Sequence, residues 1–150
     1  MTCTQAILSL LLISPCSDEG GPSMDLAIAE SLASPARPET DRAKDALRRP
    51  DQVLAFFEIE PGMTVLDLFS GGGYYTELLS GTVGADGKVV AHNNQAYVDY
   101  AAKELGPRFS DDHLANVEQV TLEASELSFP SASFDAALAI LTWHDFYYVD

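Results

Sequence analysis

From about residue 60 onward, apolar runs of strand length alternate with segments of helical apolar spacing, and this order predicts an α/β chain. The first run, residues 65–69, is interrupted only by Asp67, and three consecutive glycines follow it at residues 71–73. A helical apolar pattern begins at Tyr74. The stretch therefore predicts a buried strand, a glycine turn and the start of a helix, an arrangement that brings backbone close to a nucleotide-like ligand.

Three further apolar runs complete the predicted sheet. Residues 87–93 follow a Gly/Asp turn, and residues 116–122 are anchored by Val117 and Val120. Residues 133–141 form a near-continuous apolar run, which predicts a strand buried on both faces, as parallel sheets require.

Residues 38–57 precede the first strand and predict two short helices. We expect Asp41 to cap the first, and Arg48 and Arg49 lie near its negative end. Pro50 breaks this helix and can begin the next one. The second helix is expected to supply an apolar face at Val53, Leu54, Phe56 and Phe57.

Charge narrows the choice of partners. The chain has 23 acidic and 8 basic residues, for a net charge of −15. A phosphate backbone would be repelled, so we do not expect nucleic acid as a substrate. The three histidines and two cysteines show no metal-ligand spacing, so no metal site is expected.

The N-terminal segment differs from the rest. Residues 6–13 are apolar over the length of a signal-peptide core, so residues 1–15 are expected to be a signal-like segment, 16–37 a flexible linker and 38–150 the folded domain. The segment resembles a bacterial lipoprotein signal with Cys16 as the lipidated residue, which would attach the chain to a membrane of the bacterial cell envelope. The lack of Lys or Arg in residues 2–5 and the presence of Pro15 depart from that pattern. A cytoplasmic chain starting at Met24 is the alternative.

Two ligand classes compete for the glycine turn. A dinucleotide site requires Gly-x-Gly-x-x-Gly, but Tyr-Tyr-Thr follows Gly73 here and the third glycine is absent. Residues 67–73, Asp-Leu-Phe-Ser-Gly-Gly-Gly, instead resemble motif I of the class I S-adenosylmethionine-dependent methyltransferases, Asp-Leu-Gly-x-Gly-x-Gly. Gly71 and Gly73 match, whereas Phe69 replaces the first glycine. A strand–turn–helix without a ligand is the alternative.

The resemblance covers most of residues 38–148 and implies roles in holding the cofactor, S-adenosylmethionine. Asp67 would order the loop beside its amino-acid end. Asn93 would meet the ribose, although the family has an acidic residue there, and Glu123 would meet the adenine. A strand-end turn at Asn93 and a solvated loop carboxylate at Glu123 are the alternatives. The predicted cofactor-binding residues are Asp67, Phe69, Ser70, Gly71, Gly73, Asn93, Glu123 and Ala124.

The segment after the fourth strand is expected to line the pocket, because ligands of open parallel sheets lie beyond the carboxyl ends of the strands. His144 is a candidate general base, since its ordinary pKa lies closest to neutrality. A structural hydrogen bond at a helix start is the alternative for His144. The residues predicted to face the methyl acceptor are Trp143, His144, Asp145 and Tyr147.

The predicted fold is an α/β, Rossmann-like parallel sheet of strand order 3-2-1-4 flanked by helices. This is an incomplete class I domain, because that class usually has seven strands. The missing strands leave an apolar edge open to pairing with another chain; we expect a fragment of a longer protein or a partner that supplies the rest. The predicted function is S-adenosylmethionine-dependent methyl transfer to a small-molecule acceptor. A non-catalytic cofactor-binding or envelope interaction module is one alternative, and an NAD-dependent oxidoreductase is a weaker one.

Overall fold

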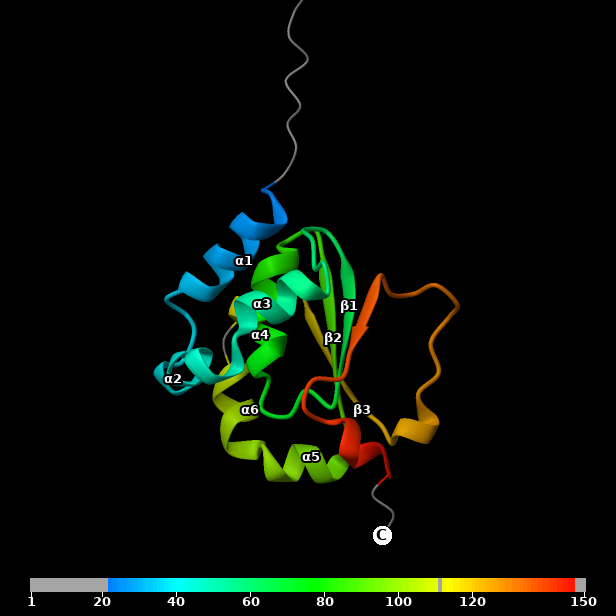
Figure 1. Ribbon diagram of the computed structural model, residues 1–150. Helices are drawn as coiled ribbons and strands as arrows, with labels where there is room; N and C mark the ends of the chain where they lie inside the picture. The colour runs from blue at the N-terminus through cyan, green and yellow to red at the C-terminus, as the bar shows by residue number, and fades with distance from the viewer. Residues whose placement is uncertain (1–21, 111, 148–150) are drawn as a thin grey trace, which may run out of the picture.

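Four parallel strands form one sheet in the order β3-β2-β1-β4 (Figure 1). The computed structural model describes residues 22–110 and 112–147, so the predicted signal segment and Cys16 lie outside the described residues. The strands are β1 (Thr64–Leu68), β2 (Lys88–Asn93), β3 (Val117–Thr121) and β4 (Ala136–Leu138). The predicted α/β class and strand order are confirmed.

Helices alternate with these strands as the sequence pattern predicts. Within the described residues, the α-helices are α1 (Met24–Ala33), α2 (Glu39–Arg48), α3 (Pro50–Phe56), α4 (Tyr74–Val83), α5 (Gln95–Tyr100) and α6 (Ala102–Arg108). Short 3-10 helices are η1 (Asp112–Leu114), η2 (Ala124–Glu126) and η3 (Trp143–Tyr147). Pro50 begins α3, as predicted.

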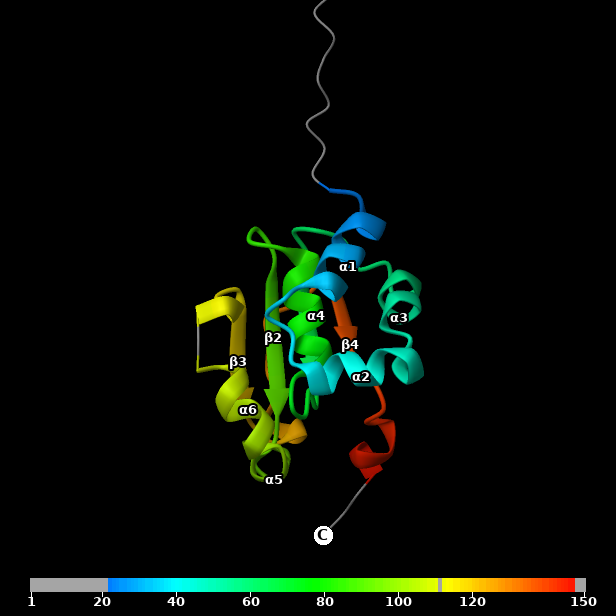
Figure 2. The same cartoon turned by 90° about the vertical axis from the view of Figure 1, so that its left-hand side faces the viewer.

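The main core lies between the sheet and helix α4, which is buried along most of its length. Leu78 and Leu79 of α4 are fully buried and belong to one cluster with Val65 and Val89 of the sheet. Helix α1 covers the outer side of α4 (Figure 2). Since burying a leucine contributes about 1.5–3 kcal/mol, this layered packing fixes where α4 begins, and therefore fixes the glycine turn before it.

Helices cover one face of the sheet, and the segment 122–135 runs along the other face (Figure 1). This difference corrects the prediction that the fourth strand is buried on both sides. The strand is only three residues long; Leu138 faces the helices and is buried, whereas Ala137 is exposed. A strand is buried on both faces only if its sequence is apolar and if other elements of the fold cover both faces of the sheet.

Two predictions ahead of β1 also differ from the structure. Residues 24–33 lie within the expected linker, yet they form α1, because Ala27 and Ile28 gain burial in the core. Asp41 does not cap α2: Pro38 occupies the cap, and Asp41 lies in the first turn, buried.

The expected apolar face of α3 is narrower than predicted. Leu54 is fully buried and Val53 packs partly against the core. Phe56 and Phe57 are 79 % and 42 % exposed. No helix in the described part of the chain is both long and apolar enough to cross a membrane.

Candidate cofactor site

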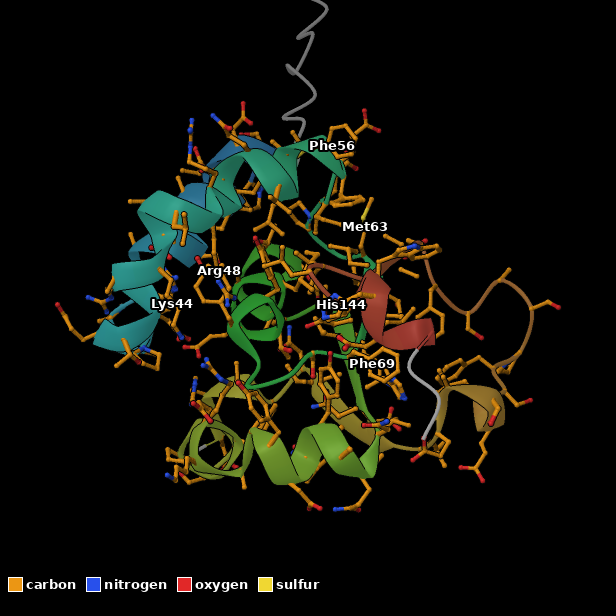
Figure 3. All side chains as sticks on the ribbon, turned by 60° about the horizontal axis from the view of Figure 1, so that its bottom comes forward. Lys44, Arg48, Phe56, Met63, Phe69 and His144 are labelled. Atoms are coloured by element: carbon orange, nitrogen blue, oxygen red, sulfur yellow. The ribbon has the colours of Figure 1, made fainter. Side chains whose placement is uncertain are left out.

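A cavity of about 550 Å³ lies at the edge of the sheet where β1 and β4 end. Its wall has five parts: α2, the turn after β1, the start of α4, the region of α5 and α6, and the segment after β4. Figure 3 views this edge, with Lys44 and Arg48 on the α2 side and Phe69 and His144 on the other. A volume of this size suits a ligand of nucleoside dimensions.

The turn between β1 and α4 is held by its own backbone. The Ser70 amide donates to the His92 carbonyl of β2 at 2.9 Å, and the Gly73 amide donates to the Ser70 carbonyl at 3.0 Å. Three of its residues, Phe69, Gly71 and Gly73, have φ values of 51°, 58° and 79°. This left-handed region favours glycine, so Phe69 adopts it at a cost of about 1–2 kcal/mol.

Phe69 stands where motif I has its first glycine, and its ring contacts compensate for the backbone strain. The ring is 6 % exposed and lies 5.0 Å from the ring centroids of both His92 and Tyr97. Phe69 also lines the cavity. The departure from the motif therefore preserves the turn and adds an aromatic wall.

The two matching glycines, Gly71 and Gly73, are needed for different reasons. At Gly71, a Cβ would meet no atom within 4 Å, so the space beside the backbone is open to a ligand. At Gly73, a Cβ would lie 2.6 Å from Cδ of Arg108. Gly71 leaves room for a ligand, whereas Gly73 leaves room for the protein's own side chain.

Arg108, at the end of α6, links the turn to two other helices. Its Nε donates to the Gly72 carbonyl at 2.5 Å, and its Nη2 donates to Asp41 of α2 at 2.5 Å. Its Nη1 donates to Glu77 of α4. The three charged side chains are all at most 6 % exposed. Such a buried cluster holds its geometry because removing one member leaves an uncompensated charge.

Asp67 is buried at the end of β1. One carboxylate oxygen accepts the Thr76 hydroxyl of α4 at 2.7 Å. Burial raises the pKa of Asp67 to about 7, and the Thr76 hydrogen bond opposes part of that rise. Asp67 lines the cavity and ties β1 to the first turn of α4, and its role beside the cofactor stays a prediction.

Asn93, expected at the ribose, has both amide atoms engaged with the turn. Its Oδ1 accepts the Gly71 amide at 2.9 Å, and its Nδ2 donates to the Gly71 carbonyl at 3.1 Å. The next residue, Asn94, caps α5, and its Nδ2 lies 3.5 Å from Oε2 of Glu123. A ribose role for Asn93 stays a prediction, whereas its clamp on Gly71 is a feature of the structure.

Glu123 and Ala124, expected near the adenine, are exposed at the start of η2. The Glu123 side chain accepts a hydrogen bond from the backbone of η2, and the Glu126 side chain accepts one from the Glu123 amide at 3.1 Å. Their predicted cofactor contacts remain predictions.

The residues expected at the acceptor lie in η3, beside the cavity. His144 is 78 % exposed, with Nε2 3.2 Å from Asp145, and Trp143 is 67 % exposed. Asp145 accepts a hydrogen bond from the Tyr97 hydroxyl of α5. Burial and this bond raise the pKa of Tyr97 well above its ordinary value. The Tyr147 side chain lies outside the described part.

Thr142 supplies a polar group that the sequence analysis did not single out. It lines the cavity, and its Oγ1 is buried with no hydrogen-bond partner among the described residues. A buried hydroxyl without a partner costs free energy, so it is available to a bound ligand. Together with the open side of Gly71, this orphaned hydroxyl fits a cavity built to receive a polar molecule.

Sequence reasoning also missed Arg108, Glu77 and Tyr97, whose partners are distant in the chain. The sequence did offer one signal for the wall of the cavity. The pattern Asp-Arg-x-x-Asp-x-x-Arg-x-Pro, residues 41–50, contains Asp41 and Arg48, and both line the cavity.

A parallel sheet of this order with a glycine turn at the end of β1 is shared by dinucleotide-binding and class I methyltransferase folds, and the comparisons with known proteins distinguish them. A structure from Aquifex aeolicus, described as a SAM-dependent methyltransferase, is 30 % identical with a TM-score of 0.58, covering 83 % of this chain and 60 % of that one. A SAM-dependent O-methyltransferase from Thermotoga maritima is 20 % identical with a TM-score of 0.43, covering 77 % of this chain and 40 % of that one. A search of curated proteins gave no match.

A family model described as protein-L-isoaspartate (D-aspartate) O-methyltransferase matches residues 46–130, which is more than half of the chain. The chain belongs to this methyltransferase family. The predicted class is confirmed, and with it S-adenosylmethionine as the cofactor. The chain spans about 60 % of the length of the Aquifex protein.

Proposed function

We propose that the protein transfers a methyl group from S-adenosylmethionine to a small-molecule acceptor. The observation that carries this proposal is the open side of Gly71, at a positive φ, facing a cavity at the carboxyl edge of the sheet. Family membership supports the reaction class. When bound, the cofactor supplies an electrophilic methyl group on its sulfonium.

The chain's own residues would bind the cofactor, align it with the acceptor and exclude water, so a dedicated nucleophile is not required. Gly71 would let the cofactor lie against the turn, and Thr142 would offer its unpaired hydroxyl. Phe69 would form an apolar wall that excludes water. His144, which is exposed in η3, would accept a proton from the acceptor.

An oxygen nucleophile is the first acceptor type to test, because the matching family model is described as an O-methyltransferase. The net charge of −15 argues against nucleic acid. The test is transfer of a radiolabelled methyl group to a panel of small carboxylic acids, alcohols and phenols, with an isoaspartyl peptide included. Label that appears on an acceptor and falls with His144→Gln would support the proposal and the proton-accepting role.

A binding module without catalysis is the second candidate. The strained Phe69 and the engaged Asn93, both departures from the motif at cofactor positions, favour it. Saturable binding of S-adenosylmethionine with no label on any acceptor would favour the module, whereas turnover would exclude it.

We also propose that residues 1–15 direct export and that Cys16 is lipidated. The support is the apolar segment 6–13 followed by a cysteine. The test is membrane fractionation of the full chain in a bacterial host beside Cys16→Ser. Loss of the chain from the membrane fraction in the variant is expected, and an unchanged distribution would contradict lipidation.

A further inference from the structure

Arg48 differs from the two other arginines that face the core around α2. Arg37 makes a two-pronged ion pair with Asp45, with N–O distances of 2.9 and 2.6 Å. Arg108 is neutralised by Asp41 and Glu77. Arg48 is partly buried and lines the cavity, yet no carboxylate among the described residues lies within ion-pair distance of it.

The Arg48 guanidinium is held in place by stacking, and its N–H groups make no hydrogen bond within residues 22–110 and 112–147. It stacks over the Tyr74 ring, 4.4 Å from the ring centroid. Tyr74 is fixed in turn, because it is 6 % exposed and its hydroxyl donates to Asp45 at 2.6 Å. A guanidinium has five N–H donors in a rigid fork that matches a carboxylate. Arg48 is therefore pre-oriented at the start of α4, next to the glycine turn, with its donors available.

Positive charge is concentrated at this cavity in an otherwise acidic chain. Four of the eight basic residues, Lys44, Arg48, Lys103 and Arg108, line it. Arg108 and Lys44 are paired with carboxylates, so Arg48 and Lys103 are the cations on the wall without an ion pair among the described residues. The same wall carries the acidic side chains of Asp41, Asp67 and Glu104, so an anionic ligand group is indicated by Arg48 itself, which is fixed over Tyr74 and unpaired among the described residues.

We propose that Arg48 binds the α-carboxylate at the methionine end of S-adenosylmethionine, in a two-pronged hydrogen-bonded ion pair. This inference rests on the proposed function, and it assigns to Arg48 a role in cofactor selection. Arg48 and Gly71 line the same cavity, so the cofactor's zwitterionic end could meet a cation and the open backbone of the turn within one site. Charge-assisted pairs of this geometry are among the stronger hydrogen bonds in proteins.

A structural role is the competing explanation, because a cation at the end of α2 complements the helix dipole. The experiment separates the two by ligand chemistry. Calorimetric titrations of the full chain compare S-adenosylhomocysteine, which carries the carboxylate, with 5′-methylthioadenosine, which lacks it. The variant is Arg48→Met, which keeps an apolar stem over Tyr74, and the control is Arg49→Met, which removes an adjacent exposed charge outside the cavity.

The expected result is that Arg48→Met weakens S-adenosylhomocysteine binding by about tenfold to a hundredfold and changes methylthioadenosine binding by less than about twofold. Arg49→Met should leave both unchanged. Equal losses for the two ligands, or no loss for either, would overturn the assignment.

A carboxylate on the acceptor could use the same site, so a second arm titrates the S-adenosylhomocysteine-loaded chain with succinate. No succinate binding supports the cofactor assignment, whereas succinate binding that Arg48→Met abolishes would overturn it. A folded wild-type chain that binds neither adenosyl ligand would defeat the proposed function itself, a result distinct from failure of Arg48 alone.

Discussion

The two sides of the cavity are built in different ways. On the α2–α4–α6 side, the glycine turn is fixed by buried charges and by hydrogen bonds that link segments far apart in sequence. On the η3 side, a three-residue strand leads to exposed residues, with the Tyr97–Asp145 hydrogen bond as a link back to α5. The contrast indicates that the α2–α4–α6 side is preorganised at the cost of buried charge, whereas the η3 side is shaped near the surface. We call them the cofactor side and the acceptor side, after the roles proposed for them.

The largest effect is expected from Arg108→Met. The variant leaves Asp41 and Glu77 buried without their main partner, so we expect a loss of about 3–5 kcal/mol in the free energy of unfolding. Urea denaturation measures it, with Arg49→Met as the exposed control. A loss as small as that of the control would show that the cofactor side is not held by this cluster.

The next effect separates the two glycines. Gly73→Ala adds strain at positive φ and collides with Arg108, so it should cost about 2–4 kcal/mol. Gly71→Ala adds the strain alone and should cost about 1–2 kcal/mol. Thermal unfolding of both variants provides the comparison. Equal losses would contradict the different reasons assigned to the two positions.

Asp67 should give the cofactor side a pH dependence. Its folded-state pKa is about 7, above the ordinary aspartate value of 3.8, so the folded state holds the proton more tightly. This contribution to stability is fully present below about pH 4 and is lost as pH rises through 7. From pH 5 to pH 8, wild type should lose about 2–3 kcal/mol relative to Asp67→Asn, which cannot ionise. Urea denaturation at the two pH values tests this. An equal change in the free energy of unfolding for wild type and Asp67→Asn would contradict it.

The smallest effect is expected on the acceptor side. Tyr97→Phe removes the hydroxyl that binds the partly exposed Asp145, and we expect a loss of about 1 kcal/mol or less. Tyr100→Phe is the matched control, because Tyr100 ends the same helix and is 89 % exposed. A loss of several kcal/mol for Tyr97→Phe would mean that the acceptor side is as firmly built as the cofactor side.

Local sequence patterns predicted the strands and the glycine turn, because each depends on residues within one short segment. The strand order was predicted from the resemblance to class I methyltransferases, and the sheet has that order. Local patterns did not predict α1, whose alanine-rich sequence resembles a linker until Ile28 is packed in the core. They also did not predict that Ala137 is exposed, because its exposure depends on which elements cover the sheet rather than on the strand itself.

Sequence patterns missed those features of the site that depend on tertiary partners. Arg108 lies 31 residues from Glu77 and 67 from Asp41, a spacing that no motif records. Asn93 was singled out because the resemblance puts a ribose-binding residue at the end of this strand, but the sequence could not show that its side-chain amide hydrogen-bonds both backbone groups of Gly71. The glycine motif was identified correctly, whereas the reason for Gly73 required the position of Arg108.

The most direct test of the account is a calorimetric titration of wild type and Gly71→Val with S-adenosylmethionine, with NAD as the reference ligand. The account predicts saturable binding of S-adenosylmethionine to wild type, little or no binding of NAD, and loss of binding in a Gly71→Val chain that remains folded by circular dichroism. Undiminished S-adenosylmethionine binding to folded Gly71→Val would contradict a cofactor site against this turn, and so would a preference of the wild type for NAD.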